Sequence, residues 1–323
     1  MTVIYAGGLL QWITGKAQDF FTNNPLSEGL ANILQGMGIA FASQGTAVLE
    51  GSTKIWKLAG EYVIRNAASD PQHFGAGAWA YASNVYSIFR GIGAALIVFF
   101  FLLGWAHEIT DVRQDMRLTV VVKFFLRLIF AEAVFDGFWG IVGSMLQYSA
   151  ILVAQMGIQM DTTITVSDVV SDAMTEANGG VAALGAGIII LVLSLVGAGA
   201  ICISAIRVIM AMAKRFFKIY VAAPIGILAV PSIAGGDKYS NTAITWFKAF
   251  IGYCLAGVVM VMAVSISTKL FGAGRQMFDI SSDGSVHVAV YCLGSILTCV
   301  LPMMTCVAFC ESADQVIGRL LGL

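Results

Sequence analysis

Cysteine and histidine are the side chains of this chain best suited to bind a metal or to act as nucleophiles and bases. The cysteines all fall in apolar stretches: Cys202, Cys254, Cys292, Cys299, Cys306 and Cys310. A thiol flanked only by apolar residues stays protonated and unreactive. The histidines, His73, His107 and His287, are far apart and have no cysteine or carboxylate at metal-ligand spacing. We therefore expect no metal site, no cofactor and no disulfide framework.

Catalytic motifs are missing from the sequence as well. The segment Gly51-Ser-Thr-Lys54 resembles the end of a phosphate-binding loop but lacks the preceding glycine at the required spacing. No nucleophile elbow and no HExxH helix frames a serine or a histidine. The sequence predicts that the protein is not an enzyme and does not hydrolyse ATP itself.

The composition indicates that most of the chain faces lipid. Of 323 residues, 58% are hydrophobic and only 11% are charged, whereas soluble domains carry about 25% charged residues. The formal net charge of -1 excludes the strongly basic surface of a nucleic-acid-binding protein. Any contact with DNA would be local or transient.

Charge-free stretches of about twenty residues predict the membrane spans. Four are clear: residues 91–106, extended back past Arg90 to Tyr86, and the stretches between Glu176 and Arg207, between Lys248 and Lys269, and between Asp283 and Glu311. A fifth, residues 118–156, is longer and is interrupted by charges. The predicted fold is therefore an all-α polytopic transmembrane protein with about five crossings.

The charges in the fifth stretch are the first candidate functional residues, because each charge inside a bilayer is costly. They are Lys123, Arg127, Glu132 and Asp136. At 100° per residue, the basic pair and the acidic pair lie on opposite sides of a helix. They could line a polar conduit, pair with another helix of the same chain such as the one bearing Arg207 or Lys214, or join neighbouring copies in a ring.

A second candidate is the apolar segment 219–236, which is interrupted by Pro224 and Pro231. It is short for a crossing and contains two helix breakers. This pattern predicts a re-entrant or broken segment whose free backbone groups are buried in protein or face water.

The basic residues predict the orientation. The segment 158–180 contains acidic residues and no Lys or Arg, whereas a basic cluster follows the next span: Arg207, Lys214, Arg215 and Lys218. The positive-inside rule places the acidic loop outside the cell and the basic cluster in the cytoplasm.

The two ends of the chain differ in character from the middle. Residues 1–85 show amphipathic helical periodicity, which predicts helices lying on the membrane surface. Residues 30–49 lack charge but contain several polar side chains, so their insertion is left open. We expect a transmembrane domain at 86–310 and a short tail at 311–323.

Part of the sequence resembles the TrbL-like inner-membrane subunits of conjugative type IV secretion systems. The resemblance rests on KRFFK (214–218), AAPIGILAVP (222–231) and TWFKAF (245–250), followed by an apolar span. It implies a multi-pass channel or scaffold component in the bacterial inner membrane, which helps a DNA-protein or effector substrate to cross. It also implies partner subunits, separate ATPases and a homo-oligomeric ring. Alternatives are a secondary transporter or ion channel with a broken-helix site, or a pore-forming toxin or holin.

Overall fold

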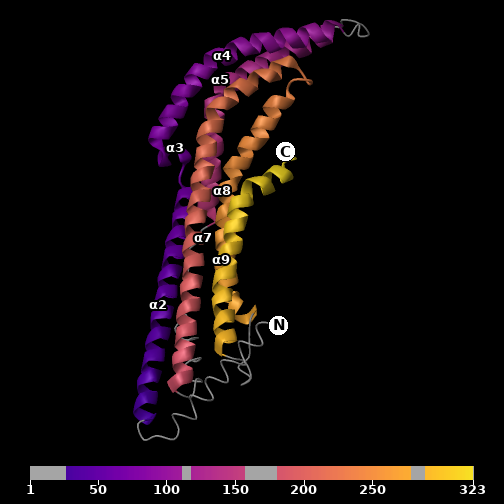
Figure 1. The fold of residues 1–323 in the computed structure, drawn as a ribbon. Coiled ribbons are helices and arrows are strands. Elements are labelled where there is room, and N and C mark those ends of the chain that lie inside the picture. The colour runs from indigo at the N-terminus through magenta and orange to yellow at the C-terminus, as the bar shows by residue number, and fades with distance from the viewer. Residues whose placement is uncertain (1–26, 111–117, 157–179, 278–287, 323) are drawn as a thin grey trace. The chain divides into compact units, whose positions relative to one another are not determined.

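The computed structural model describes residues 27–110, 118–156, 180–277 and 288–322, and every regular element in these ranges is a helix (Figure 1). The prediction of an all-α protein is confirmed for this part of the chain. The elements are α2 (Ser27–Ala68), α3 (Pro71–Phe74), α4 (Ala76–Thr110), α5 (Leu118–Gln155), α7 (Gly180–Ala229), the 3-10 helix η1 (Val230–Gly235), α8 (Asn241–Met277) and α9 (Val288–Leu320).

Four of the described segments are long and apolar enough to cross a membrane, which makes the chain a membrane protein. They are Ala76–His107, Ala183–Gly235, Asn241–Leu270 and Val300–Leu320. These segments overlap the four clear spans of the sequence. The fifth predicted span corresponds to α5, whose charges divide its apolar residues.

Of the two breaks predicted in the re-entrant or broken segment 219–236, the structure shows one, at Pro231, and none at Pro224. Helix α7 continues through Pro224 to Ala229, and the chain changes only to a 3-10 helix at Val230, next to Pro231. A proline removes one backbone hydrogen bond from a helix, but the flanking Ala223 and Ile227 are completely buried, and this packing holds the helix together. A helix of 50 residues is about 75 Å long, more than twice the thickness of the hydrocarbon core.

The chain divides into two compact units. The first comprises residues 1–60, 160–207 and 265–307, and the second comprises residues 61–159, 208–264 and 308–323. Several helices contribute to both units because α2, α7, α8 and α9 each continue across a boundary.

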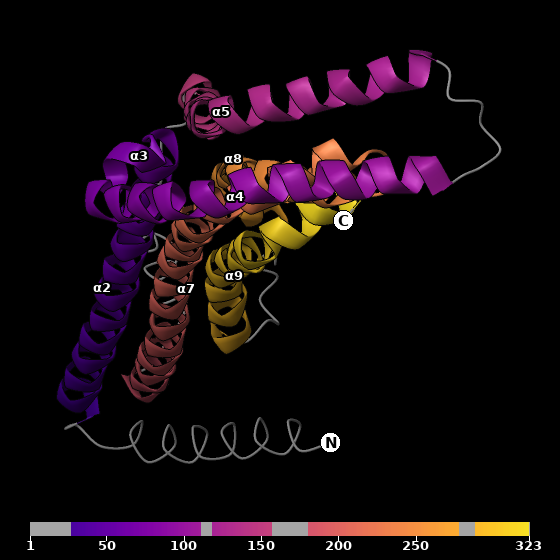
Figure 2. The same cartoon turned by 90° about the horizontal axis from the view of Figure 1, so that it is seen from above.

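In the first unit, α7 packs against α2 and α9, and the three helices lie side by side (Figures 1 and 2). Glycines allow this packing. A Cβ atom added to Gly38 of α2 would collide with the backbone of Ala183, and one added to Gly187 of α7 would collide with the backbone of Gly38. Such close backbone approach is a common way for helices to associate in lipid, where apolar side chains gain little by leaving the solvent.

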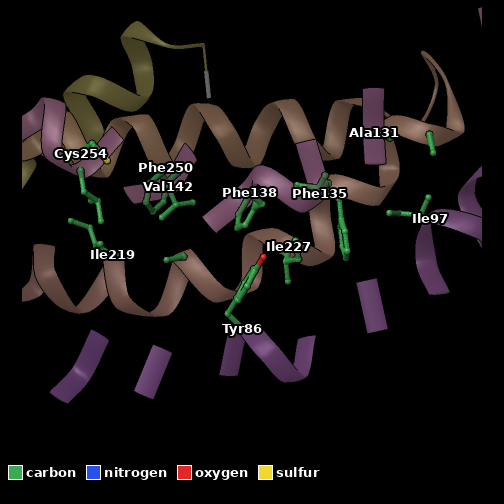
Figure 3. Packing of buried hydrophobic residues seen from close by; sticks show 14 residues of the cluster. Tyr86, Ile97, Ala131, Phe135, Phe138, Val142, Ile219, Ile227, Phe250 and Cys254 are labelled. Carbon is green, nitrogen blue, oxygen red and sulfur yellow. The ribbon is translucent and has the colours of Figure 1, made fainter. Parts of the chain in front are cut away.

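In the second unit, apolar side chains from α4, α5, α7, η1 and α8 form one core, shown in Figure 3. Aromatic rings dominate its centre. Phe138 of α5 lies 5.2 Å from Trp246 of α8, which stacks on Phe250 at 5.0 Å between ring centroids. Both α4 and α5 also pack against η1.

Candidate functional site

Two of the three sequence segments that carry the family resemblance, AAPIGILAVP and TWFKAF, contribute to the core of the second unit, and KRFFK precedes them on α7. KRFFK and most of AAPIGILAVP lie on the second half of α7, and TWFKAF lies at the start of α8. The two helices touch where Gly226 faces Trp246, because a Cβ atom at Gly226 would overlap the indole ring and that of Phe138. The segments that are distinctive in sequence are therefore also those that build the α7–α8 contact.

The connection between α7 and α8 is fixed by hydrogen bonds around η1. The buried Ser232 hydroxyl donates to the carbonyl of Ala229 at 2.7 Å and accepts from the backbone N–H of Ala243 at 3.2 Å. The second bond satisfies one of the N–H groups that a helix leaves free in its first turn. At Gly236 the chain turns with φ of 85°, a conformation that favours glycine. The turn is thus defined by specific contacts.

Arg215 is the most unusual residue of this region, because its side chain is only 2% exposed. Its Nε donates to the carbonyl of Tyr253 and its Nη2 to the carbonyl of Cys254, both at 3.1 Å. The guanidinium lies against Gly257, where a Cβ atom would stand 2.5 Å from Cζ and 2.7 Å from Nη1. Arg215 therefore joins α7 to α8 in a place that only glycine leaves open.

An ion pair joins the same part of α7 to α9. Lys218 Nζ donates to Asp314 Oδ2, and the ammonium also lies 5.8 Å from the centre of the Tyr253 ring. We call Arg215, Lys218 and Asp314 the buried charge cluster after the buried Arg215; the side chain of Lys218 is 44% exposed and that of Asp314 is 24% exposed. Their contacts connect α7 to α8 and α9 within the second unit.

The predicted basic cluster is thus divided by the structure. Arg207 and Lys214 are exposed, Lys218 is partly exposed and paired, and Arg215 is buried. Arg207 belongs to the first unit and the other three residues to the second. A positive-inside count treats all four alike because it does not register which side of the helix each one occupies.

The charges of α5 are also divided into paired and unpaired residues. Arg127 binds Asp237 with 2.7 Å between Nη2 and Oδ1, and Asp136 binds Arg90 of α4 with 2.9 Å between the corresponding atoms. These partners differ from Arg207 and Lys214, the partners considered from the sequence. Asp237 follows η1, so its ion pair fastens the α7–α8 connection to α5.

Lys123 and Glu132 are exposed on α5, and neither has an ion-pair partner within the described residues. Large apolar side chains near Glu132 on the same helix are exposed too, among them Phe125 and Ile129. A carboxylate on such a surface is costly in lipid unless it faces protein or water.

Sequence reasoning missed Arg90, Asp237, Gly257 and Asp314 as partners of the predicted charges. Asp237 and Asp314 were visible as charges beside apolar runs, but their partners are 110 and 96 residues away in the chain. No local pattern shows that Gly257 makes room for a guanidinium.

Comparisons of the chain with protein-family models, with curated proteins and with solved structures find no match. The chemistry of the site must therefore be judged from its own residues. Arg215 holds a positive charge between α7 and α8, and Lys218 and Asp314 join α7 to α9.

Proposed function

We propose that this chain is an inner-membrane channel or scaffold subunit of a bacterial type IV secretion system. The observation that supports the proposal is that AAPIGILAVP and TWFKAF, which resemble segments of TrbL-like subunits, pack in one core, and that Arg215 of the third segment, KRFFK, binds backbone carbonyls of α8. In this role the protein helps a DNA-protein or effector substrate to cross the inner membrane. Separate ATPases supply the energy.

For the topology we propose crossings by α4, α5, α7, α8 and α9, with the acidic segment 158–180 outside. That segment lies almost entirely outside the described residues. Gly38 contacts the apolar start of α7, but α2 is not among the described segments that are long and apolar enough to cross a membrane, so we count no crossing for residues 30–49. A single cysteine at Thr163 in a cysteine-free version should react with an impermeant reagent in intact cells. Reaction only after lysis would reverse the orientation.

We further propose that copies of the chain form a ring through Lys123 and Glu132. These residues are nine positions apart, so they lie about 180° apart on α5, on opposite sides of the helix, as a head-to-tail contact requires. Neither is paired within the described part of the chain. Exchanging the two charges (K123E with E132K) should restore assembly that either single change weakens, as judged in native gels. Normal assembly of both single variants would contradict the ring contact.

The alternative, a secondary transporter or ion channel, depended on a doubly broken helix at 219–236. Helix α7 passes through Pro224 without a break, which weakens that hypothesis. The coding sequence can be deleted from the bacterium that carries it, and the wild-type copy can be restored on a plasmid. Comparing the two strains distinguishes a secretion subunit from a transporter. Loss of conjugative transfer or effector secretion supports the proposal. Unchanged secretion with lost uptake of a small solute would favour the transporter.

A further inference from the structure

Charged side chains from three elements gather at one end of the second unit. The end of α4, the start of α5 and the turn between η1 and α8 lie together there, because α4 and α5 both pack against η1 (Figure 1). In the turn, Lys238 Nζ lies 3.1 Å from Nε2 of His107 of α4, and Asp237 binds Arg127 of α5. We call these four residues the η1 charge group.

The η1 charge group carries more positive than negative charge. Asp237 is engaged by Arg127, and the described residues provide no carboxylate for Lys238. The ammonium of Lys238 contacts the His107 ring instead. A lysine ammonium only donates hydrogen bonds, so the ring nitrogen accepts and does not balance the charge. The group therefore attracts an anion.

The η1 charge group also lies where the apolar segments end. The segment in α4 ends at His107, the segment in α7 and η1 ends at Gly235, and the next one begins at Asn241. Trp105 of α4 packs against Phe124 of α5 with 5.9 Å between ring centroids, and tryptophan is typical of the boundary between hydrocarbon and headgroups. The charges are therefore placed at the depth of lipid headgroups.

An apolar strip runs from the charges along α4. Leu103 lies one turn before His107 and is exposed, and Phe100 lies one turn further from the end of the helix. The Phe100 ring is 6.0 Å from the ring of Tyr239, the residue that follows Lys238. A lipid with its phosphate at Lys238 would lay an acyl chain along Leu103 and Phe100.

We propose that the η1 charge group binds the phosphate of an anionic phospholipid such as phosphatidylglycerol. Lys238 donates to the phosphate oxygens, Arg127 adds the N–H groups that Asp237 does not engage, and His107 positions the ammonium. Basic side chains between transmembrane helices bind lipid headgroups in this way. The site does not depend on the proposed role in secretion, because it rests on charge and on depth in the membrane.

Titration of the purified full-length protein with phosphatidylglycerol and with phosphatidylcholine tests the site. Both lipids contain a phosphate, but only phosphatidylglycerol has a net negative charge, and native mass spectrometry measures how much of each lipid is bound. A lysine near an anionic lipid contributes about fivefold in affinity, so K238Q should bind phosphatidylglycerol about fivefold more weakly than the parent. Unchanged affinity in K238Q, or equal affinity of the parent for the two lipids, would overturn the proposal.

Two further variants separate the site from general effects of charge and folding. Lys269 is exposed and also lies at the end of an apolar segment, Asn241–Leu270, but it is outside the η1 charge group, so K269Q should bind like the parent. D237N removes the negative charge of the group and should bind phosphatidylglycerol more tightly, a gain that a misfolded variant would not show. An equal loss in K269Q and K238Q, or weaker binding by D237N, would contradict the site.

Thermal stability distinguishes a lipid from a free anion. A ligand that binds the folded state raises the unfolding midpoint, so phosphatidylglycerol in detergent micelles should stabilise the parent more than K238Q. Inorganic phosphate at the same concentration should have no such effect, because it cannot use the apolar strip on α4. An equal rise with inorganic phosphate would overturn the assignment of a lipid.

Discussion

The contact between Arg215 and Gly257 gives the sharpest test of the buried charge cluster. In Gly257→Ala, the new Cβ would lie 2.5 Å from Cζ of Arg215, a distance that non-bonded atoms do not occupy. The guanidinium must shift away from α8, and because it is the end of a flexible side chain, the cost depends on how far it moves. The upper limit is the loss of both bonds to the carbonyls of Tyr253 and Cys254.

The expected cost follows from these two bonds. Each hydrogen bond from a charged group contributes about 1.5–3 kcal/mol, so their loss costs about 3–6 kcal/mol. Alanine is favoured over glycine inside a helix by about 1 kcal/mol. The upper limit of the net destabilisation is therefore about 2–5 kcal/mol, and we expect a lower midpoint when the purified protein is heated in detergent and followed by tryptophan fluorescence.

Gly252→Ala is the matched control on the same helix. A Cβ at Gly252 would meet only side-chain atoms at 3.7 and 3.9 Å, so this variant should be as stable as the parent or slightly more stable. Gly257→Ala combined with Arg215→Leu should lose less stability than the sum of the two single changes, because the clash is absent. Equal midpoints for Gly257→Ala and Gly252→Ala would refute the placement of Arg215.

Three further predictions concern contacts outside the buried charge cluster. Gly38→Leu should separate α2 from α7 and increase proteolysis of the α2 region. Gly36→Leu should not, because nothing lies within 4 Å of a Cβ at Gly36. Equal protease sensitivity of the two variants would argue against the packing of α2 on α7. Ser232→Ala should lower the free energy of unfolding by about 1–3 kcal/mol, since it leaves the buried N–H of Ala243 unpaired. The control is Ser240→Ala, whose hydroxyl hydrogen bond is exposed. Thermal unfolding should show no comparable loss of stability for this control. Arg127→Glu should destabilise the protein by up to about 1 kcal/mol and should be rescued by Asp237→Arg in the same thermal assay. Rescue by Glu132→Arg instead would indicate that Arg127 contacts Glu132 of a neighbouring copy rather than Asp237.

The sequence by itself determined the helical class, the membrane environment and the position of four apolar segments. These properties depend on composition and on the spacing of charged residues, because a stretch that crosses a bilayer must be apolar over about twenty residues and must satisfy its own backbone hydrogen bonds. The same spacing located Arg127 and Asp136 as charges that need partners, which the structure supplies as Asp237 and Arg90.

Only the tertiary structure decided the course of α7 and the partners of its cations. Pro224 looks like a break in the sequence, yet the packing of the flanking residues holds the helix together. Arg215 looks like one of four cytoplasmic cations, yet the bare backbone at Gly257 and two carbonyl groups of α8 receive it in the core. These outcomes depend on residues about forty positions away, which a local pattern cannot register because the energy of a buried charge is set by the groups around it in space.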